Sequence, residues 1–175
     1  RRELHYVRSL LSPTQVSSIL RQCSNAADGF NKARCLVAVE DGEPQSNGLA
    51  LVLLPMLNDR IVPFARSVCG APVVVADALV RCYDPADGNE SLAAHYDLTS
   101  FASVIVPLNP GDCEGGLYVQ LGASHDTRRS VDFERAGDAL LHRYDVMHGV
   151  DVRGGRRYSL VVWLAETEGG MTQGR

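Results

Sequence analysis

Short strand-like runs fill the second half of the chain, and this pattern restricts the possible folds more than any other feature. Each run is rich in β-branched residues or alternates apolar with polar side chains, and each is bounded by Gly, Pro, Asn or Asp. The runs cover residues 73–84, 101–108, 116–121, 138–143, 148–152 and 156–164. Several short strands at this spacing predict an antiparallel sandwich or barrel.

A first helix is predicted near the start of the chain. Ser12 can cap it, Pro13 suits the first helical position, and Gln15 completes a capping-box pattern. We expect this helix over residues 13–23.

A second helix is predicted over residues 55–69, and Gly70-Ala71-Pro72 provides its end. The apolar residues that recur there at helical spacing are Leu57, Ile61, Phe64, Ala65 and Val68. Between the two helices, Leu36–Val39 is predicted as a short strand. Residues 40–48 carry the Gly, Pro, Asn and Asp of a turn or mobile loop.

The length and the apolar content indicate one domain. The chain has 175 residues, of which 45% are apolar, enough to fill a single core. We therefore expect one domain over residues 1–175 that is mainly β within the α+β class. Helical support is expected over residues 1–70 and the β core over residues 71–165.

The charge balance excludes some classes of partner. The net charge is −4 and no basic block is present, so a nucleic acid or an anionic membrane is not expected as partner. The longest apolar stretch, Leu49–Leu57, contains Pro55 and is far shorter than the ~20 residues of a membrane-spanning helix. We expect a soluble protein without a membrane span, in a compartment that the sequence does not indicate.

Cysteine and lysine usage excludes further chemistry. The five cysteines are scattered and form no Cys-x-x-Cys pair, so neither a disulfide framework nor a thiolate zinc site is indicated. Lys32, the single lysine, lies in a polar stretch, which argues against Schiff-base chemistry.

The most informative motif is His95-Tyr96-Asp97, with His148 further along the chain. On a strand, residues two apart project from the same face, so His95 and Asp97 can converge while Tyr96 faces away. A second histidine from a neighbouring strand would complete a set of two imidazoles and one carboxylate. Such a set leaves metal positions open and suits non-heme Fe(II) and oxygen chemistry.

A second motif follows His148. Arg157 and Ser159 are two residues apart on a predicted strand and share a face. If that face meets the same cavity, the guanidinium and the hydroxyl can hold a carboxylate by charge-assisted hydrogen bonds. The combination predicts a site for a small keto-dicarboxylate that is chelated by iron at one end and anchored at the other.

In these motifs the chain resembles the Fe(II)- and 2-oxoglutarate-dependent dioxygenases, with the prolyl 4-hydroxylase and lysyl hydroxylase branch as the nearest likeness. The resemblance covers residues 73–164 and rests on His95-Tyr96-Asp97, Leu108-Asn109, Glu114-Gly115-Gly116, His148-Gly149-Val150 and Arg157-Tyr158-Ser159-Leu160. It implies a double-stranded β-helix (jelly roll) with N-terminal supporting helices.

The resemblance also implies the roles of site residues. His95, Asp97 and His148 would be the iron ligands, and Arg157, aided by Ser159, would bind the C5 carboxylate of 2-oxoglutarate. Tyr83 matches a tyrosine that often hydrogen-bonds this co-substrate. The chain departs from the family pattern at Pro107, where members frequently carry a tyrosine. Asp97 stands where halogenating relatives have a small residue, which favours hydroxylation.

The expected function is hydroxylation of an unactivated C–H bond. The sequence itself does not distinguish between the possible substrate classes. The expected cofactors are Fe(II), 2-oxoglutarate and O₂, with ascorbate as a further candidate, and the products are succinate and CO₂. A prolyl or other peptidyl side chain is the leading substrate by resemblance, and a free amino acid or small metabolite is the alternative. A jelly-roll binding module without turnover stays open. A zinc-dependent hydrolase that uses the same two histidines is a third possibility, but the sequence contains no general-base motif such as His-Glu-x-x-His.

The remaining candidates receive structural roles. His5, His125 and His142 have no partner at ligand spacing and are interpreted as surface or structural residues. Trp163 is predicted to be core, with the pocket wall as the alternative. Residues 84–90 and 40–48 are hypothesised to rim the substrate entrance, because loops on a rigid scaffold commonly select substrates.

Overall fold

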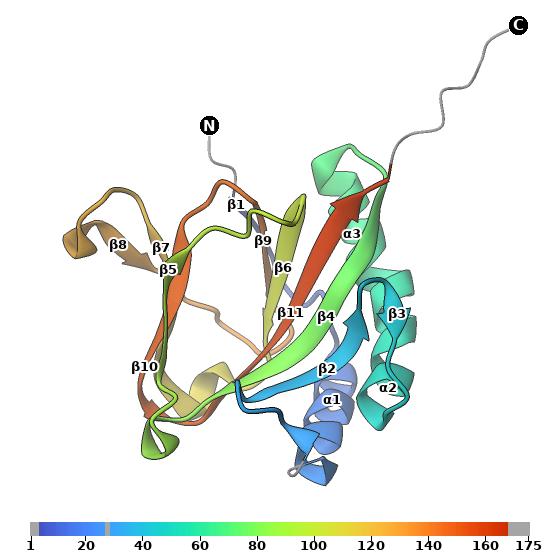
Figure 1. Cartoon of the computed structure of the whole chain (residues 1–175), viewed down its shortest axis with the longest axis horizontal. Helices are drawn as coiled ribbons and strands as arrows, with labels where there is room; N and C mark the ends of the chain where they lie inside the picture. Colours follow the sequence, from blue (N-terminus) through green and yellow to red (C-terminus); the bar gives the residue numbers. More distant parts are fainter. Residues whose placement is uncertain (1–3, 27–28, 168–175) are drawn as a thin grey trace, which may run out of the picture.

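The computed structural model describes residues 4–26 and 29–167. In this part of the chain the strands form a seven-stranded and a four-stranded antiparallel sheet that face each other, and helices cover the outer face of the larger one (Figure 1). The larger sheet has the order β1 (Leu4–Val7), β9 (Ala139–Arg143), β6 (Ala102–Pro107), β11 (Arg157–Glu166), β4 (Val73–Tyr83), β2 (Cys35–Glu40) and β3 (Glu43–Pro44). The smaller sheet has the order β5 (Ser91–His95), β10 (His148–Gly155), β7 (Cys113–Gln120) and β8 (Arg128–Ser130). The expected double-stranded β-helix is confirmed.

The first helix, α1 (Pro13–Asn25), begins as predicted. The backbone N–H of Gln15 donates to Ser12 Oγ at 3.2 Å, and the N–H of Ser12 donates to Gln15 Oε1 at 2.8 Å. Both arms of the capping box are therefore formed, and Pro13 occupies the first turn. Val16, Ile19 and Cys23 form the buried face of the helix.

The second helix begins earlier than predicted. A continuous helical run comprises α2 (Gly48–Met56), the π-helical turn η2 (Leu57–Ile61) and α3 (Val62–Cys69). The predicted start at residue 55 was wrong because Asn47 caps the run: its Oδ1 accepts from the N–H of Ala50 at 2.9 Å. Pro55 lies inside the helix, where it removes one backbone donor, and the widened turn follows directly. Gly70, at φ 63°, ends the run as predicted.

This run is the core helix of the domain. It has 22 residues and contains an 18-residue window with a mean hydropathy of 1.4, so by length and composition alone it could cross a membrane. Its buried side chains, among them Leu53, Leu57 and Ile61, belong to the main core between the helices and the larger sheet. A core helix meets the same criterion as a membrane span, and we interpret this one as core.

The first 70 residues, predicted as helical support, also contribute strands. Residues 36–39 form β2 as expected, and residues 40–48 contain the hairpin to β3 and the cap of α2. The N-terminal segment adds strands at both edges of the larger sheet, because β1 pairs with β9 at one edge and β2 pairs with β4 toward the other. The short strands β1, β3 and β8 were missed by the sequence pattern.

Two layers of buried side chains result. The main core lies between the larger sheet and the helices, and it takes every second residue of β11, such as Leu160, Val162 and Leu164. A smaller cluster, including Ile105, Leu117 and Val150, lies between the two sheets. The remaining residues of β11 face this inner layer, which therefore holds the polar residues of the candidate site.

Candidate active site

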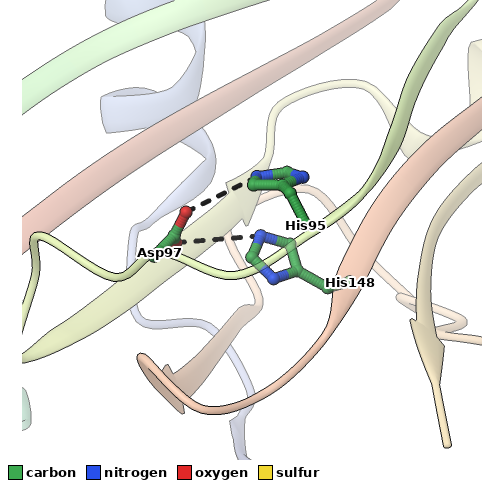
Figure 2. A group of neighbouring side chains, drawn as sticks. All are labelled: His95, Asp97 and His148. Atoms are coloured by element: carbon green, nitrogen blue, oxygen red, sulfur yellow. Dashed lines mark ion pairs between the residues drawn. The ribbon is translucent and has the colours of Figure 1, made fainter. Parts of the chain in front are cut away.

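His95, Asp97 and His148 converge at one end of the inner layer. His95 is the last residue of β5 and His148 the first of β10, and the two are partners in the strand register. One ligand atom from each of the three residues lies within 4.8 Å of the others. Figure 2 shows the Asp97 carboxylate pointing toward both imidazoles. Asp97 lies beyond the end of β5 rather than on it, so the chain turns the carboxylate inward without regular strand alternation.

The hydrogen bonds of both histidines leave the ligand nitrogen available. Nδ1 of His95 lies 2.9 Å from the carbonyl of Ala93, and Nδ1 of His148 lies 3.0 Å from the carbonyl of Val146. Because a carbonyl only accepts, each Nδ1 carries the proton and each Nε2 keeps its lone pair. These Nε2 atoms lie 3.5 Å and 3.7 Å from the Asp97 carboxylate oxygens. This donor set fits a divalent transition metal.

The carboxylate of Asp97 is buried and remains ionised. Burial by itself raises the pKa of Asp97, but the contacts with His95 and Ser103 outweigh it and hold the pKa well below its usual range. Ser103 Oγ donates to Asp97 Oδ2 at 2.5 Å. The contact with Asp97 raises the pKa of His95, whereas burial lowers the pKa of His148 to about 4. At neutral pH, the imidazole of His148 is therefore uncharged.

A third histidine lies beside this group. His142 on β9 is fully buried, its Nε2 lies 3.9 Å from Asp97 Oδ2, and its ring centroid is 4.3 Å from that of His148. Its Nδ1 is bonded to the carbonyl of Arg143, and its Nε2 has no hydrogen-bond partner within residues 4–26 and 29–167. Of the two interpretations offered for His142, surface or structural, its burial excludes the first. The available signal was its place on a predicted strand, two residues after the inward-facing Leu140.

Arg157 marks the other end of the inner layer. Its side chain is 3% exposed, and its Nε and Nη2 have no hydrogen-bond partner among the described residues. A Cβ at Gly116, where φ is 143°, would lie 2.9 Å from Arg157 Nη1. A side chain at this position would crowd the guanidinium, and the φ values of Gly115 (81°) and Gly116 (143°) are ones that residues with a Cβ rarely adopt. Burial lowers the pKa of Arg157. A buried, unpaired cation of this kind indicates a place for an anion.

Ser159 and Tyr83 lie next to Arg157. Tyr83 is its register partner on β4, and Ser159 follows two residues later on the same face of β11. Both side chains are buried, and Ser159 Oγ has no hydrogen-bond partner in the described part of the chain. Burial raises the pKa of Tyr83 to about 12, so its hydroxyl stays a donor at neutral pH. Pro107 pairs with Ser159 and offers no hydroxyl at this place.

A cavity joins the two ends. Its lining includes His95, Asp97 and His148 at one end, and Tyr83, Arg157 and Ser159 at the other. Apolar side chains form most of the wall between them: Leu92, Ile105, Leu117, Val150, Val161 and Trp163. Trp163 is thus part of the pocket wall, the alternative to the predicted core position. Apolar walls reduce the local screening and strengthen charge interactions inside the cavity.

The two loops expected at the entrance lie at different places. Residues 84–90 follow Tyr83, and Asp84 forms an ion pair with Arg156 at 2.7 Å, so this loop lies at the opposite end of β5 from His95. In the hairpin over residues 40–48, the N–H of Asp41 donates to Asp77, which is the register partner of Trp163. Of the two loops, only residues 40–48 therefore lie next to the part of β4 that is paired with Trp163, a residue of the cavity wall.

Arg81 is a cavity residue that the sequence reasoning did not single out. It lies on β4 opposite Ser159 and lines the cavity together with His95 and Trp163. Its position two residues before Tyr83 on one predicted strand was the signal that could have identified it.

The sequence matches no protein-family model and no curated protein sequence. Solved structures are similar in fold. A non-heme alpha-ketoglutarate-dependent epimerase, SnoN from nogalamycin biosynthesis, superposes with a TM-score of 0.69 at 16% identity, over 95% of this chain and 77% of that one. A prolyl-4-hydroxylase from Pseudomonas putida gives 0.66 at 17% identity, over 95% and 94%. A prolyl hydroxylase from Trichoplax adhaerens, in complex with a hypoxia-inducible-factor peptide, gives 0.66 at 17% identity, over 93% and 83%.

These similarities establish the double-stranded β-helix fold. The epimerase and the prolyl hydroxylases are equally similar to the chain by TM-score and identity, so the comparison does not select the prolyl 4-hydroxylase branch.

Proposed function

We propose that the chain is an Fe(II)- and 2-oxoglutarate-dependent dioxygenase that hydroxylates an unactivated C–H bond and releases succinate and CO₂. One observation carries this proposal: a histidine, histidine and aspartate group and an unpaired buried arginine occupy opposite ends of one cavity. A binding module without turnover has no need for both. Structures named as alpha-ketoglutarate-dependent or 2OG-Fe(II) oxygenases among the similar folds support it.

His95, Asp97 and His148 are the residues that would hold the metal. With 2-oxoglutarate and O₂ bound, Fe(II) would supply the oxidising chemistry, and three protein ligands leave positions for both. The protein orients these ligands through the second hydrogen bond of each. The carbonyls of Ala93 and Val146 fix the imidazole rings, and Ser103 holds one oxygen of Asp97.

Arg157 would anchor the C5 carboxylate of 2-oxoglutarate. Its free Nε and Nη2 provide two parallel donors, which suit a bidentate carboxylate contact. The hydroxyls of Tyr83 and Ser159 lie on the same inner face and would add neutral donors. The apolar wall between the two ends would exclude water from the reaction.

We propose a prolyl or other peptidyl side chain as the substrate, which the similar fold of two prolyl hydroxylases, one with a bound peptide, supports. A free amino acid or small metabolite is the alternative, supported by the similar fold of SnoN from nogalamycin biosynthesis. Ascorbate is proposed as a further reductant that sustains turnover.

An anaerobic titration of the metal-free protein with Fe(II) and 2-oxoglutarate tests the proposal. The parent should develop the visible charge-transfer band of a keto acid chelated to Fe(II). His148→Ala should show no band, and Arg157→Leu should show it only at higher 2-oxoglutarate concentration. A folded parent protein without a band would overturn the dioxygenase proposal and favour the binding module.

A further inference from the structure

A second arginine lines the cavity, next to Tyr83 and Ser159. Arg81 lies on the inner face of β4, two residues from Tyr83 and directly opposite Ser159. Its guanidinium carbon lies 5.1 Å from the centre of the Tyr83 ring. It lines the same cavity as His95, Asp97 and His148.

Arg81 is not neutralised by the protein. Its Nε is buried and has no hydrogen-bond partner, and it forms no ion pair with any residue in the ranges 4–26 and 29–167. The acidic residue Asp77 shares its strand and face, but the carboxylate of Asp77 accepts from the backbone N–H of Asp41. A buried guanidinium donor without a partner is costly unless a ligand supplies an acceptor.

The charges of the proposed site balance without Arg81. The dianion 2-oxoglutarate would offset a divalent metal, and the Asp97 carboxylate offsets the Arg157 guanidinium at the other end of the cavity. Arg81 therefore adds one positive charge that the metal, the co-substrate and the site residues leave uncompensated. A ligand with one negative charge would compensate it.

Resting on the dioxygenase function proposed above, we propose that Arg81 binds a carboxylate of the prime substrate, so that the enzyme oxidises a carbon close to a carboxylate group. The two carboxylates of 2-oxoglutarate already have partners in the metal and Arg157. A monoanionic, planar carboxylate suits a planar guanidinium whose buried Nε has no hydrogen-bond partner among the described residues. A phosphate dianion would need further cations, and Lys32, the one lysine of the sequence, does not line this cavity.

The test uses pairs of compounds that differ in one charge. Free aspartate and asparagine, free glutamate and glutamine, and capped peptides that contain these residues are titrated into the anaerobic Fe(II) and 2-oxoglutarate complex by calorimetry. Succinate release is then measured in air. At least one acidic compound should bind about tenfold or more tightly than its amide partner, as expected for a charge-assisted contact. Comparison of free acids with peptides identifies which source the site accepts.

Three variants assign the preference to Arg81. Arg81→Leu should abolish the discrimination between acid and amide while the charge-transfer band forms at unchanged 2-oxoglutarate concentration. Arg81→Lys should retain part of the discrimination, because it keeps the charge and loses the fork. Arg153→Leu, at an arginine of β10 that does not line this cavity, should behave as the parent.

The outcomes separate the two proposals. If the parent gives no charge-transfer band, the dioxygenase function fails. If the band forms but no acid binds more tightly than its amide, or if Arg81→Leu keeps the discrimination, the assignment of Arg81 is wrong. An Arg81→Leu variant that loses 2-oxoglutarate affinity as strongly as Arg157→Leu would instead make Arg81 part of the co-substrate site and also overturn the assignment.

Discussion

His95 and His148 are direct partners across β5 and β10, with ring centroids 4.5 Å apart. The register of one strand pair therefore fixes the spacing of the two imidazoles. The Asp97 carboxylate follows just beyond the end of β5, and Ser103 of the opposite sheet donates a hydrogen bond to it. The candidate metal site thus joins both sheets, and its geometry depends on Ser103 as well as on the three proposed ligands.

Ser103→Ala should weaken metal binding. The variant loses the hydrogen bond to Asp97 Oδ2, so the carboxylate is no longer held in one orientation. We expect the Kd for Fe(II) to rise by about tenfold to hundredfold, measured anaerobically by competition with a chromophoric chelator. Ser130→Ala, which removes an exposed serine that bonds to Asp132, is the control and should not change the Kd. Equal affinity of the Ser103→Ala variant and the parent would contradict this role.

Gly116→Ala should impair 2-oxoglutarate binding and spare the metal. The added Cβ would lie 2.9 Å from Arg157 Nη1, at a φ of 143° that alanine rarely adopts, and would displace the guanidinium. The loss of one charge-assisted hydrogen bond, about 1.5–3 kcal/mol, corresponds to about tenfold or more in Kd. Calorimetry with 2-oxoglutarate measures it. Gly111→Ala, where no atom lies within 4 Å of the added Cβ, is the matched control.

The metal-free protein should lose stability in mild acid. Burial lowers the pKa of His148 from 6.5 to about 4, so below pH 6.5 the unfolded chain takes up a proton that the folded chain does not. The free energy of unfolding should therefore fall by about 2 kcal/mol between about pH 7 and about pH 5. His95 acts in the opposite direction: its raised pKa adds stability in acid that is lost as pH rises through the folded pKa.

Urea unfolding at the two pH values separates these contributions. His148→Gln should show a smaller decrease than the parent, because the group whose pKa is lowered by burial is gone. A decrease of the same size in the variant would show that His148 is not its source.

Asn47→Ala should destabilise the whole domain. Asn47 accepts from the N–H of Ala50 at the start of α2 and donates to the carbonyl of Val37 on β2 at 2.7 Å. It therefore caps the core helix and ties it to the larger sheet. We expect a loss of about 1–2 kcal/mol in the free energy of unfolding, measured by urea denaturation. The exposed Ser18→Ala variant, inside α1, should stay within about 0.5 kcal/mol of the parent.

The sequence pattern predicted the elements that bury one face. The six predicted runs became β4, β6, β7, β9, β10 and β11, because alternation or β-branching is strong where a strand faces a core. Strands β1 and β8 have only four and three residues, so they carry little signal. The start of α2 was hidden because residues 48–56 are apolar all round and show no helical period.

The shared faces of the site were most directly predictable where two residues lie in one motif. His95 with Asp97, and Arg157 with Ser159, lie two apart in the sequence, so their common face could be inferred. Arg81 and His142 owe their positions to the pairing of β4 with β11 and of β6 with β9, where Ser103 stands opposite His142. Strand register of this kind is a property of the folded sheet and not of any local pattern.

The strand that carries His95 has consequences for how the proposed metal would enter and leave the site. Among the described strands, β5 lies at the end of the smaller sheet and is hydrogen-bonded to β10 alone, with a register irregularity next to His148. Such a strand can detach while the larger sheet and its helices stay folded. We therefore expect metal exchange to be a local event, visible as fast amide hydrogen exchange over residues 91–95 in the metal-free protein and as slow exchange after loading.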